Sequence, residues 1–416
     1  PRMLSLAFML LVLSSGVWGQ SKIPAEQSLT VATANNWLQV TGTNGNGDPD
    51  RLQVVFFEVP ASASGILYFG VRDASTDGQA QNPGFDTDGA PDQDALGTTT
   101  FTLLGGTGAL SSPDATLVRY PTASVAYTGT TLASFAAANE DDNPFTGPAY
   151  GWRYFAGVSP SQGELIGNKR YFKVIAQADT SVGKNAFQLD VSYTASGAPT
   201  GVDGVRSFAY AWTLALVQRA GATWNLHPFV GDLEAGNVAV HSWDMDDGEA
   251  LALYAKSGYT VTPAPTISGN SGTWPNDVRS DSYVITTVET ASGGLDQNNG
   301  TWNLRVTENT NPGGTNINTS LFWASSSTFT GDGWPGSATD TVRRIYASEY
   351  NPPDPQQVVL APVDGQAYAD ASSPYDTETV AVQVADSNGD PLPYVRSVYL
   401  TVDNGAIFDS ASSGTA

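Results

Sequence analysis

The chain of 416 residues carries 18 basic and 41 acidic side chains, for a formal net charge of −23, and it contains no cysteine and only two histidines. A surface this acidic repels nucleic acid and anionic lipid headgroups, so neither is expected as a partner. Without cysteine, thiol catalysis and cysteine-based zinc sites are excluded, and two histidines are too few for a histidine-rich metal centre.

Residues 1–19 are typical of a secretory signal peptide. Arg2 precedes the apolar run LSLAFMLLVL, and the small residues of SSGVWGQ follow it. The run is too short to span a bilayer comfortably, so we expect cleavage near Gly19 and Gln20. The alternative is a buried N-terminal strand. No second apolar stretch of membrane-spanning length follows, and the sequence therefore predicts a secreted or cell-surface protein without a membrane span.

Residues 20–222 are predicted to form a β-sandwich domain with acidic loops. Short runs that alternate apolar with polar residues recur there, and turn residues separate them. One alanine-rich segment, 130–139 (TTLASFAAAN), is predicted to be a short helix. The predicted strands are 52–59, 65–71, 98–104, 170–177, 185–193 and 207–217.

The same pattern continues through residues 223–350, which are predicted to be a second, jelly-roll-like β-sandwich. Its predicted strands are 237–243, 250–255, 282–288, 301–308 and 319–324. Strands in series with short Gly-, Asn- and Pro-rich turns are typical of antiparallel sandwiches. The expected fold class is therefore all-β, with tandem antiparallel β-sandwiches.

Two motifs in these blocks, GKNAFQLDVSY (183–193) and GTWNLRVTE (300–308), are short and apolar. They resemble the last strands of small jelly-roll modules that are attached to secreted bacterial proteases. The resemblance implies a fold and no activity.

A third block, 358–416, follows the Pro-rich stretch NPPDPQQ (351–357), which is predicted to be a stiff linker. Strands are predicted at 377–385 and 396–402. Asn-Gly in the turn between them suits a tight hairpin because both residues tolerate positive φ. The turn has the pattern D-x-N-G-x-P-x-P, made by Asp386, Asn388, Gly389, Pro391 and Pro393.

This strand–turn–strand pattern, with the Gly-containing stretch that leads to Ala416, resembles the bacterial Ig-like domain of invasin and intimin. The resemblance implies a rod-like spacer of the kind found in surface proteins, often adhesins, with no catalytic residues to carry over. The family's last strands would lie beyond Ala416, so the domain is expected to be truncated here.

The segment FDTDGAPDQD (85–94) is a candidate calcium site. Calcium binds six to eight carboxylate and carbonyl oxygens, usually on a flexible loop, and Gly89 allows a sharp turn. An EF-hand is excluded, because Ala90 and Gly97 occupy positions that would need ligands. The alternative is a solvated acidic loop. The candidate ligands are Asp86, Asp88, Asp92 and Asp94.

A second acidic segment, HSWDMDDGEA (241–250), offers carboxylates around Gly248 between two strands. It is either another calcium site or a charged hairpin with Trp243 packed into the core. Its candidate ligands are Asp244, Asp246, Asp247 and Glu249.

No catalytic residue is predicted, and the protein is not expected to be an enzyme. His227 and His241 lie within or beside apolar strands, where a structural role is commoner than a catalytic one. The nucleophile-elbow, P-loop and H-E-x-x-H motifs are absent from the sequence. Acidic residues in Gly- and Asn-rich turns do not suit a glycosidase pair, which needs one carboxyl with a raised pKa.

Four tryptophans of the second block leave two interpretations open. They could line a sugar-binding face, or they could pack in the core, as most tryptophans of β-sandwiches do. The four are Trp274, Trp302, Trp323 and Trp334.

We therefore expect an exported bacterial surface or extracellular protein with a structural or adhesive role, with calcium as the candidate ion that stiffens it. Its partner would be a surface glycan or a protein ligand. The alternative is the non-catalytic, carbohydrate- or protein-binding arm of a larger secreted hydrolase.

Overall fold

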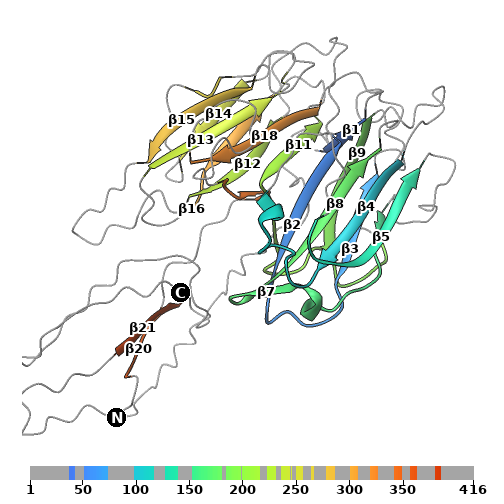
Figure 1. Ribbon diagram of the computed structural model, residues 1–416, viewed down its shortest axis with the longest axis vertical. Helices are drawn as coiled ribbons and strands as arrows, with labels where there is room; N and C mark the ends of the chain where they lie inside the picture. The colour runs from blue at the N-terminus through green and yellow to red at the C-terminus, as the bar shows by residue number, and fades with distance from the viewer. Residues whose placement is uncertain are drawn as a thin grey trace, which may run out of the picture.

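The computed structural model confirms the all-β class: antiparallel sheets of eight, eleven and two strands make up the fold (Figure 1). The structure describes residues 37–42, 51–73, 98–116, 127–138, 152–179, 184–197, 199–215, 223–230, 236–243, 245, 250–255, 264–266, 278–285, 300–307, 319–326, 342–348, 357–362 and 380–385.

The eight-stranded sheet, here sheet A, has the strand order β15-β13-β18-β11-β1-β9-β3-β6. Its strands are β1 (Trp37–Thr41), β3 (Tyr68–Asp73), β6 (Trp152–Tyr154), β9 (Lys184–Ser192), β11 (Ala211–Ala215), β13 (Gly236–Trp243), β15 (Arg279–Ile285) and β18 (Thr319–Ser325).

The eleven-stranded sheet, sheet B, has the order β14-β17-β12-β19-β10-β2-β8-β4-β5, with β16 beside β12 and β7 beside β8. Its strands are β2 (Leu52–Pro60), β4 (Thr98–Gly105), β5 (Thr130–Ala138), β7 (Glu164–Ile166), β8 (Lys169–Ala178), β10 (Arg206–Ala209), β12 (Thr223–Val230), β14 (Ala250–Tyr254), β16 (Gly300–Thr301), β17 (Asn303–Thr307) and β19 (Ile345–Tyr346). Two short 3₁₀ turns, η3 (Pro113–Thr116) and η5 (Pro160–Gln162), lie in the connections.

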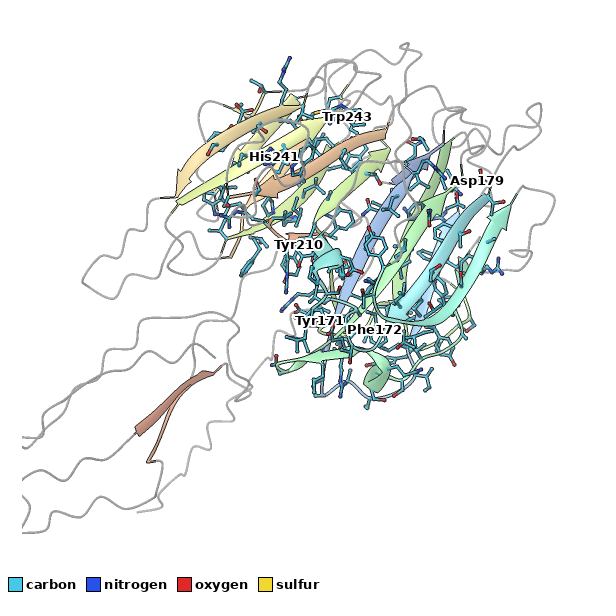
Figure 2. The ribbon with its side chains drawn as sticks, in the orientation of Figure 1. Tyr171, Phe172, Asp179, Tyr210, His241 and Trp243 are labelled. Atoms are coloured by element: carbon cyan, nitrogen blue, oxygen red, sulfur yellow. The ribbon has the colours of Figure 1, made fainter. Side chains whose placement is uncertain are left out.

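A single run of chain, residues 206–215, belongs to both sheets. Its first part, β10, pairs with β2 and β19 in sheet B, and its second part, β11, pairs with β1 and β18 in sheet A. Tyr210 lies between the two parts, and Figure 2 shows it where the two halves of the molecule meet. The two sheets are therefore connected at this run.

The side chain of Gln53, on β2, bonds the backbone of β11 where that strand leaves sheet B. Its Oε1 accepts from the Thr213 amide (2.7 Å) and hydroxyl (2.8 Å), and its Nε2 donates to the Ala211 carbonyl (3.0 Å). Buried backbone groups without partners are costly, so this side chain replaces the strand-to-strand hydrogen bonds that β2 no longer supplies.

One hydrophobic core cluster runs through strands of both sheets and both halves. It includes Phe57, Phe69, Trp212, Leu304 and Phe322, none of them exposed by more than 1 %. Phe57 and Phe69 meet edge to face, with ring centroids 4.9 Å apart, between β2 of sheet B and β3 of sheet A. The core is thus the layer between the two sheets, as the alternating sequence pattern predicts.

The predicted boundary at 222/223 falls within a continuous structure. Strand β11 of the first block pairs with β18 of the second, and β10 pairs with β19. Both sheets and the core continue across this position. The domain limits stay predictions, but the described strands of the two blocks form shared sheets.

The predicted helix at 130–139 is wrong, because residues 130–138 form the edge strand β5. It pairs with β4 from end to end apart from one β-bulge at Leu132, and Phe135 packs against Phe101 at 5.4 Å. Pairing with β4 and burial of that ring therefore outweigh the helix propensity of four alanines.

The remaining predictions concern the ends of the chain. In the third block, β20 (Gln357–Pro362) and β21 (Val380–Ala385) form a separate antiparallel pair. The predicted signal peptide, most of the linker and the D-x-N-G-x-P-x-P turn lie outside the described residues. Within the described part, no helix is long and apolar enough to cross a bilayer.

Candidate functional site

The outer face of sheet B carries two rows of directly paired side chains, and directly opposed residues of antiparallel strands share a face. Their neighbours Phe57 and Phe172 belong to the core between the sheets, so the two rows point away from that core. The first row contains Lys173, Phe56, Phe208, Tyr346 and His227; the second contains Tyr171, Glu58 and Arg206.

The first row forms a buried aromatic layer. Phe56 stacks on Phe208 with centroids 5.1 Å apart, and Phe208 lies 5.4 Å from Tyr346. Leu110 and Ala115 pack onto this layer from the segment after β4. These rings are 0–3 % exposed, so they form a hydrophobic floor and are not available to stack on a ligand.

Three cations surround the buried carboxylate of Glu58. The nearest N···O distances are 3.6 Å from Arg206, 3.7 Å from Lys169 and 3.8 Å from Arg344. The Tyr171 hydroxyl donates a hydrogen bond to Glu58 Oε2 at 3.2 Å. We call Lys169, Arg206 and Arg344 the basic cluster.

The basic cluster joins the two sequence blocks. Lys169 and Arg206 come from the first block, and Arg344 comes from the second, just before β19. The guanidinium of Arg344 lies 4.8 Å from the centroid of the Phe208 ring and 5.6 Å from that of Tyr171. A cation over an aromatic face is attracted by the ring quadrupole, so Arg344 packs on the aromatic layer while it faces Glu58.

The surroundings of Arg344 keep its guanidinium charged. Burial alone lowers the pKa of Arg344, but neighbouring oxygens raise it above its usual value overall. These neighbours are Tyr346, Tyr210, Tyr171 and Glu58. Burial, followed by the charge of Glu58, raises the pKa of the Tyr171 phenol, so this hydroxyl remains a hydrogen-bond donor at neutral pH.

The basic cluster has a surplus of positive charge and is open to solvent. The three cations and Glu58 together carry two positive charges, and one further buried carboxylate, that of Glu164, lies opposite Tyr171 in the same row. The side chains of Arg206, Lys169 and Arg344 are 21 %, 22 % and 32 % exposed, against 5 % for Glu58. The arrangement can therefore attract and hydrogen-bond an anionic group from solution.

Beside this cluster, Glu164 holds the segment after β4 against the sheet. Its carboxylate accepts hydrogen bonds from the amides of Gly108 (2.9 Å), Leu110 (2.5 Å) and Ser111 (2.9 Å) and from the Ser111 hydroxyl. Burial raises the pKa of Glu164, but these hydrogen bonds outweigh it and the pKa is lowered overall. The carboxylate thus holds in place the segment after β4, which covers the aromatic layer.

Lys173 is enclosed at the end of the aromatic row. It is 0 % exposed, its Nζ lies 4.9 Å from the centroid of the Tyr127 ring, and no hydrogen-bond partner from the described part of the chain reaches this amine. Burial lowers the pKa of Lys173, although the charges of Asp114 and Glu164 act in the opposite direction.

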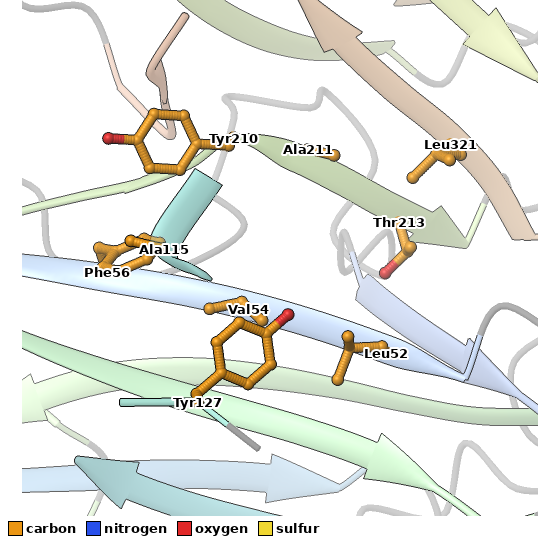
Figure 3. Close-up of a pocket in the computed structure, with 9 residues that line it drawn as sticks. All are labelled: Leu52, Val54, Phe56, Ala115, Tyr127, Tyr210, Ala211, Thr213 and Leu321. Atoms are coloured by element: carbon orange, nitrogen blue, oxygen red, sulfur yellow. The ribbon is translucent and has the colours of Figure 1, made fainter. Parts of the chain in front are cut away.

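A small cavity lies where the two halves meet. Figure 3 shows Tyr127 and Tyr210 on its sides, and Phe56, Thr213 and Leu321 also line it. Its volume of about 20 Å³ is enough for one water molecule and too small for a sugar or a side chain.

His241 is a structural residue in this fold. Its Nδ1 is hydrogen-bonded to the Ser280 hydroxyl (2.5 Å) and its Nε2 to the Ser325 hydroxyl (2.7 Å), and its ring stacks on Trp323 with centroids 4.9 Å apart. Burial lowers the pKa of His241 to about 3. A base this weak is neutral at physiological pH and does not suit general-base catalysis.

Two of the four tryptophans considered for sugar stacking are core residues. Trp302 is 4 % exposed and Trp323 is 2 % exposed, so neither can stack on a ligand, and the core interpretation is correct for both. Trp274 and Trp334 lie outside the described residues.

All eight predicted calcium ligands lie outside the described residues: Asp86, Asp88, Asp92, Asp94, Asp244, Asp246, Asp247 and Glu249. The described part of the chain contains no group of three or more His, Asp or Glu side chains that could hold a metal ion. Calcium binding by the acidic segments therefore stays a prediction.

The sequence held two weak signals for the basic cluster. Glu58 interrupts the apolar run LQVVFFEVP, and the pair Arg343–Arg344 stands out in a chain with only 18 basic residues. Neither signal shows that Glu58 and Arg344 are partners. The two residues are far apart in the sequence, and only the fold brings them together.

Comparison with known proteins adds no family or relative to this picture. No family model matches the chain, and no curated protein sequence matches it.

Proposed function

We propose that the protein is an exported bacterial surface or extracellular protein with a structural or adhesive role, whose β-sandwich body presents a binding surface. The observation that carries this proposal is continuity: two sheets and one core run through the described strands between residues 37 and 348. Close-packed interiors transmit strain, so such a body keeps a surface patch in fixed geometry under load. The basic cluster supplies a patch.

Export and adhesion can be tested separately. Expressed with its own N-terminus in a bacterial host, the protein should leave the cytoplasm with a new N-terminus near Gln20. The labelled, purified protein should then bind a subset of an array of surface glycans and surface proteins. Cytoplasmic retention of the uncleaved chain contradicts the export proposal, and an array without saturable binding contradicts the adhesive role.

Calcium in the acidic segments 85–94 and 241–250 would stiffen this body by cancelling like charges within the loops. A ligand that binds only the folded state raises the melting temperature. Calorimetry in calcium and in chelator should therefore differ by several degrees, and equal melting temperatures would remove the metal from the proposal.

The basic cluster also suits the second candidate, the non-catalytic binding arm of a larger secreted hydrolase, since such an arm needs a ligand-binding face. The complete open reading frame separates the two. A linked domain with a recognisable active site favours the enzyme arm, whereas further Ig-like repeats with a surface anchor favour the adhesin.

A further inference from the structure

We infer that the basic cluster binds the carboxylate or sulfate groups of an acidic polysaccharide. This inference rests on the proposed function, because it names the ligand class of the binding surface. Three cations converge on one face of a chain whose net charge is −23 and which has only 18 basic residues. Such a local surplus of positive charge is the feature that an anionic ligand recognises.

The contacts of the cations with Glu58 do not use up their capacity to hydrogen-bond a second anion. Their distances to Glu58, 3.6–3.8 Å, exceed the range of about 2.7–3.2 Å for a hydrogen bond. Glu58 therefore keeps the cations together through charge, with the Tyr171 hydroxyl as its hydrogen-bond donor. Two of the three cations are guanidinium groups, whose planar fork matches a carboxylate or sulfate edge.

The surface around the cluster favours a polysaccharide over a protein partner. Stable protein interfaces need a desolvated core rich in apolar and aromatic side chains. Here the aromatic layer lies buried beneath the cations. Among the described residues, the large exposed apolar side chains nearby are Leu165 and Ile166, on the β7–β8 hairpin that carries Lys169. A hydrated polyanion needs charge complementarity without such a core.

The test measures binding of the purified full chain to polygalacturonate and dextran sulfate, with neutral dextran and polyglutamate as comparisons. We expect binding to at least one acidic polysaccharide, none to neutral dextran, and weaker binding to polyglutamate. The affinity should fall roughly tenfold between 50 and 200 mM salt, as counterion release by a few cations predicts.

Variants connect this binding to the cluster. Lys169→Gln and Arg206→Gln should each weaken binding about 3- to 10-fold, the effect of removing one ion pair. Arg305→Gln is the matched control, because Arg305 also packs on an aromatic ring, Tyr254 at 4.9 Å, and lies on the same outer face of sheet B but on β17, which β12 and β19 separate from β10. It makes the same change in net charge and should leave the affinity within about twofold.

Glu58→Gln should act in the opposite direction. It raises the local charge from two to three positive charges, so binding should tighten about 2- to 5-fold in the folded variant. Circular dichroism and melting curves confirm the fold of each variant. Lys169→Gln, on a partly exposed side chain at a hairpin, keeps the test valid if Arg206→Gln or Glu58→Gln does not fold.

Three outcomes overturn the inference: no binding to either acidic polysaccharide, equal weakening by Arg305→Gln and Lys169→Gln, or binding to polyglutamate as tight as to polygalacturonate. These outcomes are distinct from failure of the proposed function. Array binding that Lys169→Gln does not change would keep the adhesive role and remove this site. If the chain is not exported but still binds an acidic polysaccharide through the cluster, this site would be kept and the proposed surface role would be removed.

Discussion

Two fully buried glutamines show how much a single polar side chain contributes to this fold. Gln53 is 2 % exposed, and its amide bonds the backbone of β11 at Thr213 and Ala211. Gln39 on β1 is 0 % exposed, and neither polar atom of its side chain has a hydrogen-bond partner among the residues that the structure describes. The same residue type is thus satisfied at one buried position and unsatisfied at the other.

We predict opposite consequences for the same substitution at these positions. Gln53→Leu should lower the free energy of unfolding by about 2–4 kcal/mol, because it leaves a buried amide and a buried carbonyl unpaired. Gln39→Leu should change it by less than about 1 kcal/mol or raise it, because no hydrogen bond is lost. Urea denaturation of both variants measures the difference, and equal losses would contradict the role given to Gln53.

His241 makes stability depend on pH. Its pKa is about 3 in the folded state and about 6.5 in an unfolded chain. Below pH 6.5 the unfolded state therefore binds more protons than the folded state. The contribution of neutral His241 to the free energy of unfolding is present above that pH and is lost as the pH falls toward 3. The free energy of unfolding should drop by about 2 kcal/mol between pH 6.5 and 5. His241→Asn should lack this slope; an unchanged slope would show that another group causes it.

At the scale of single elements, the sequence predicts most strands because apolar runs bounded by turn residues mark them. The burial of β4 alternates over most of its length, whereas β2 and β8 are buried over five and six consecutive residues. Strands β2, β4, β8 and β13 lie within one residue of their predicted ranges at either end. The alanine-rich β5 was misassigned, because no local pattern shows that β4 pairs along its full length. The short strands β7 and β19 carry too few residues to produce a period.

The basic cluster, the proposed binding site, was harder to predict than the strands. Its members come from β2, β8, β10 and the residue before β19, so no continuous motif contains it. The acidic segments, in contrast, are local and visible in the sequence, and for that reason they dominated the sequence-based prediction. Charged residues that are far apart in the sequence form this cluster only because their strands pair in a particular register. That register cannot be read directly from the sequence.

The segment after β4 tests the part that Glu164 plays. Glu164→Gln removes the charged carboxylate that accepts hydrogen bonds from the amides of Gly108, Leu110 and Ser111. These three amides should therefore exchange hydrogen at least tenfold faster at pH 7. The folded pKa of Glu164 is lowered, so its contribution exists above the unfolded pKa and is lost as the pH falls through the folded value. The difference between variant and parent should therefore disappear in acid; a difference that persists there would contradict this assignment.

At the scale of the whole molecule, two opposing features shape the protein. A net charge of −23 promotes solubility but makes the folded chain repel itself. Shared sheets, a common core and the contact of Arg344 with Glu58 join the two halves against this repulsion. We conclude that the halves form one connected body, and the proposed structural or adhesive role rests on that property.

Force spectroscopy on the full chain, pulled from its ends, tests this claim most directly. If the two halves form one body, the region from residue 37 to residue 348 should unfold in one step that releases roughly 1,000 Å of chain. Gln53→Leu should lower the force of that same step. Two separate steps of roughly half that length, with only one of them weakened by Gln53→Leu, would show that the halves are independent domains and would contradict the account.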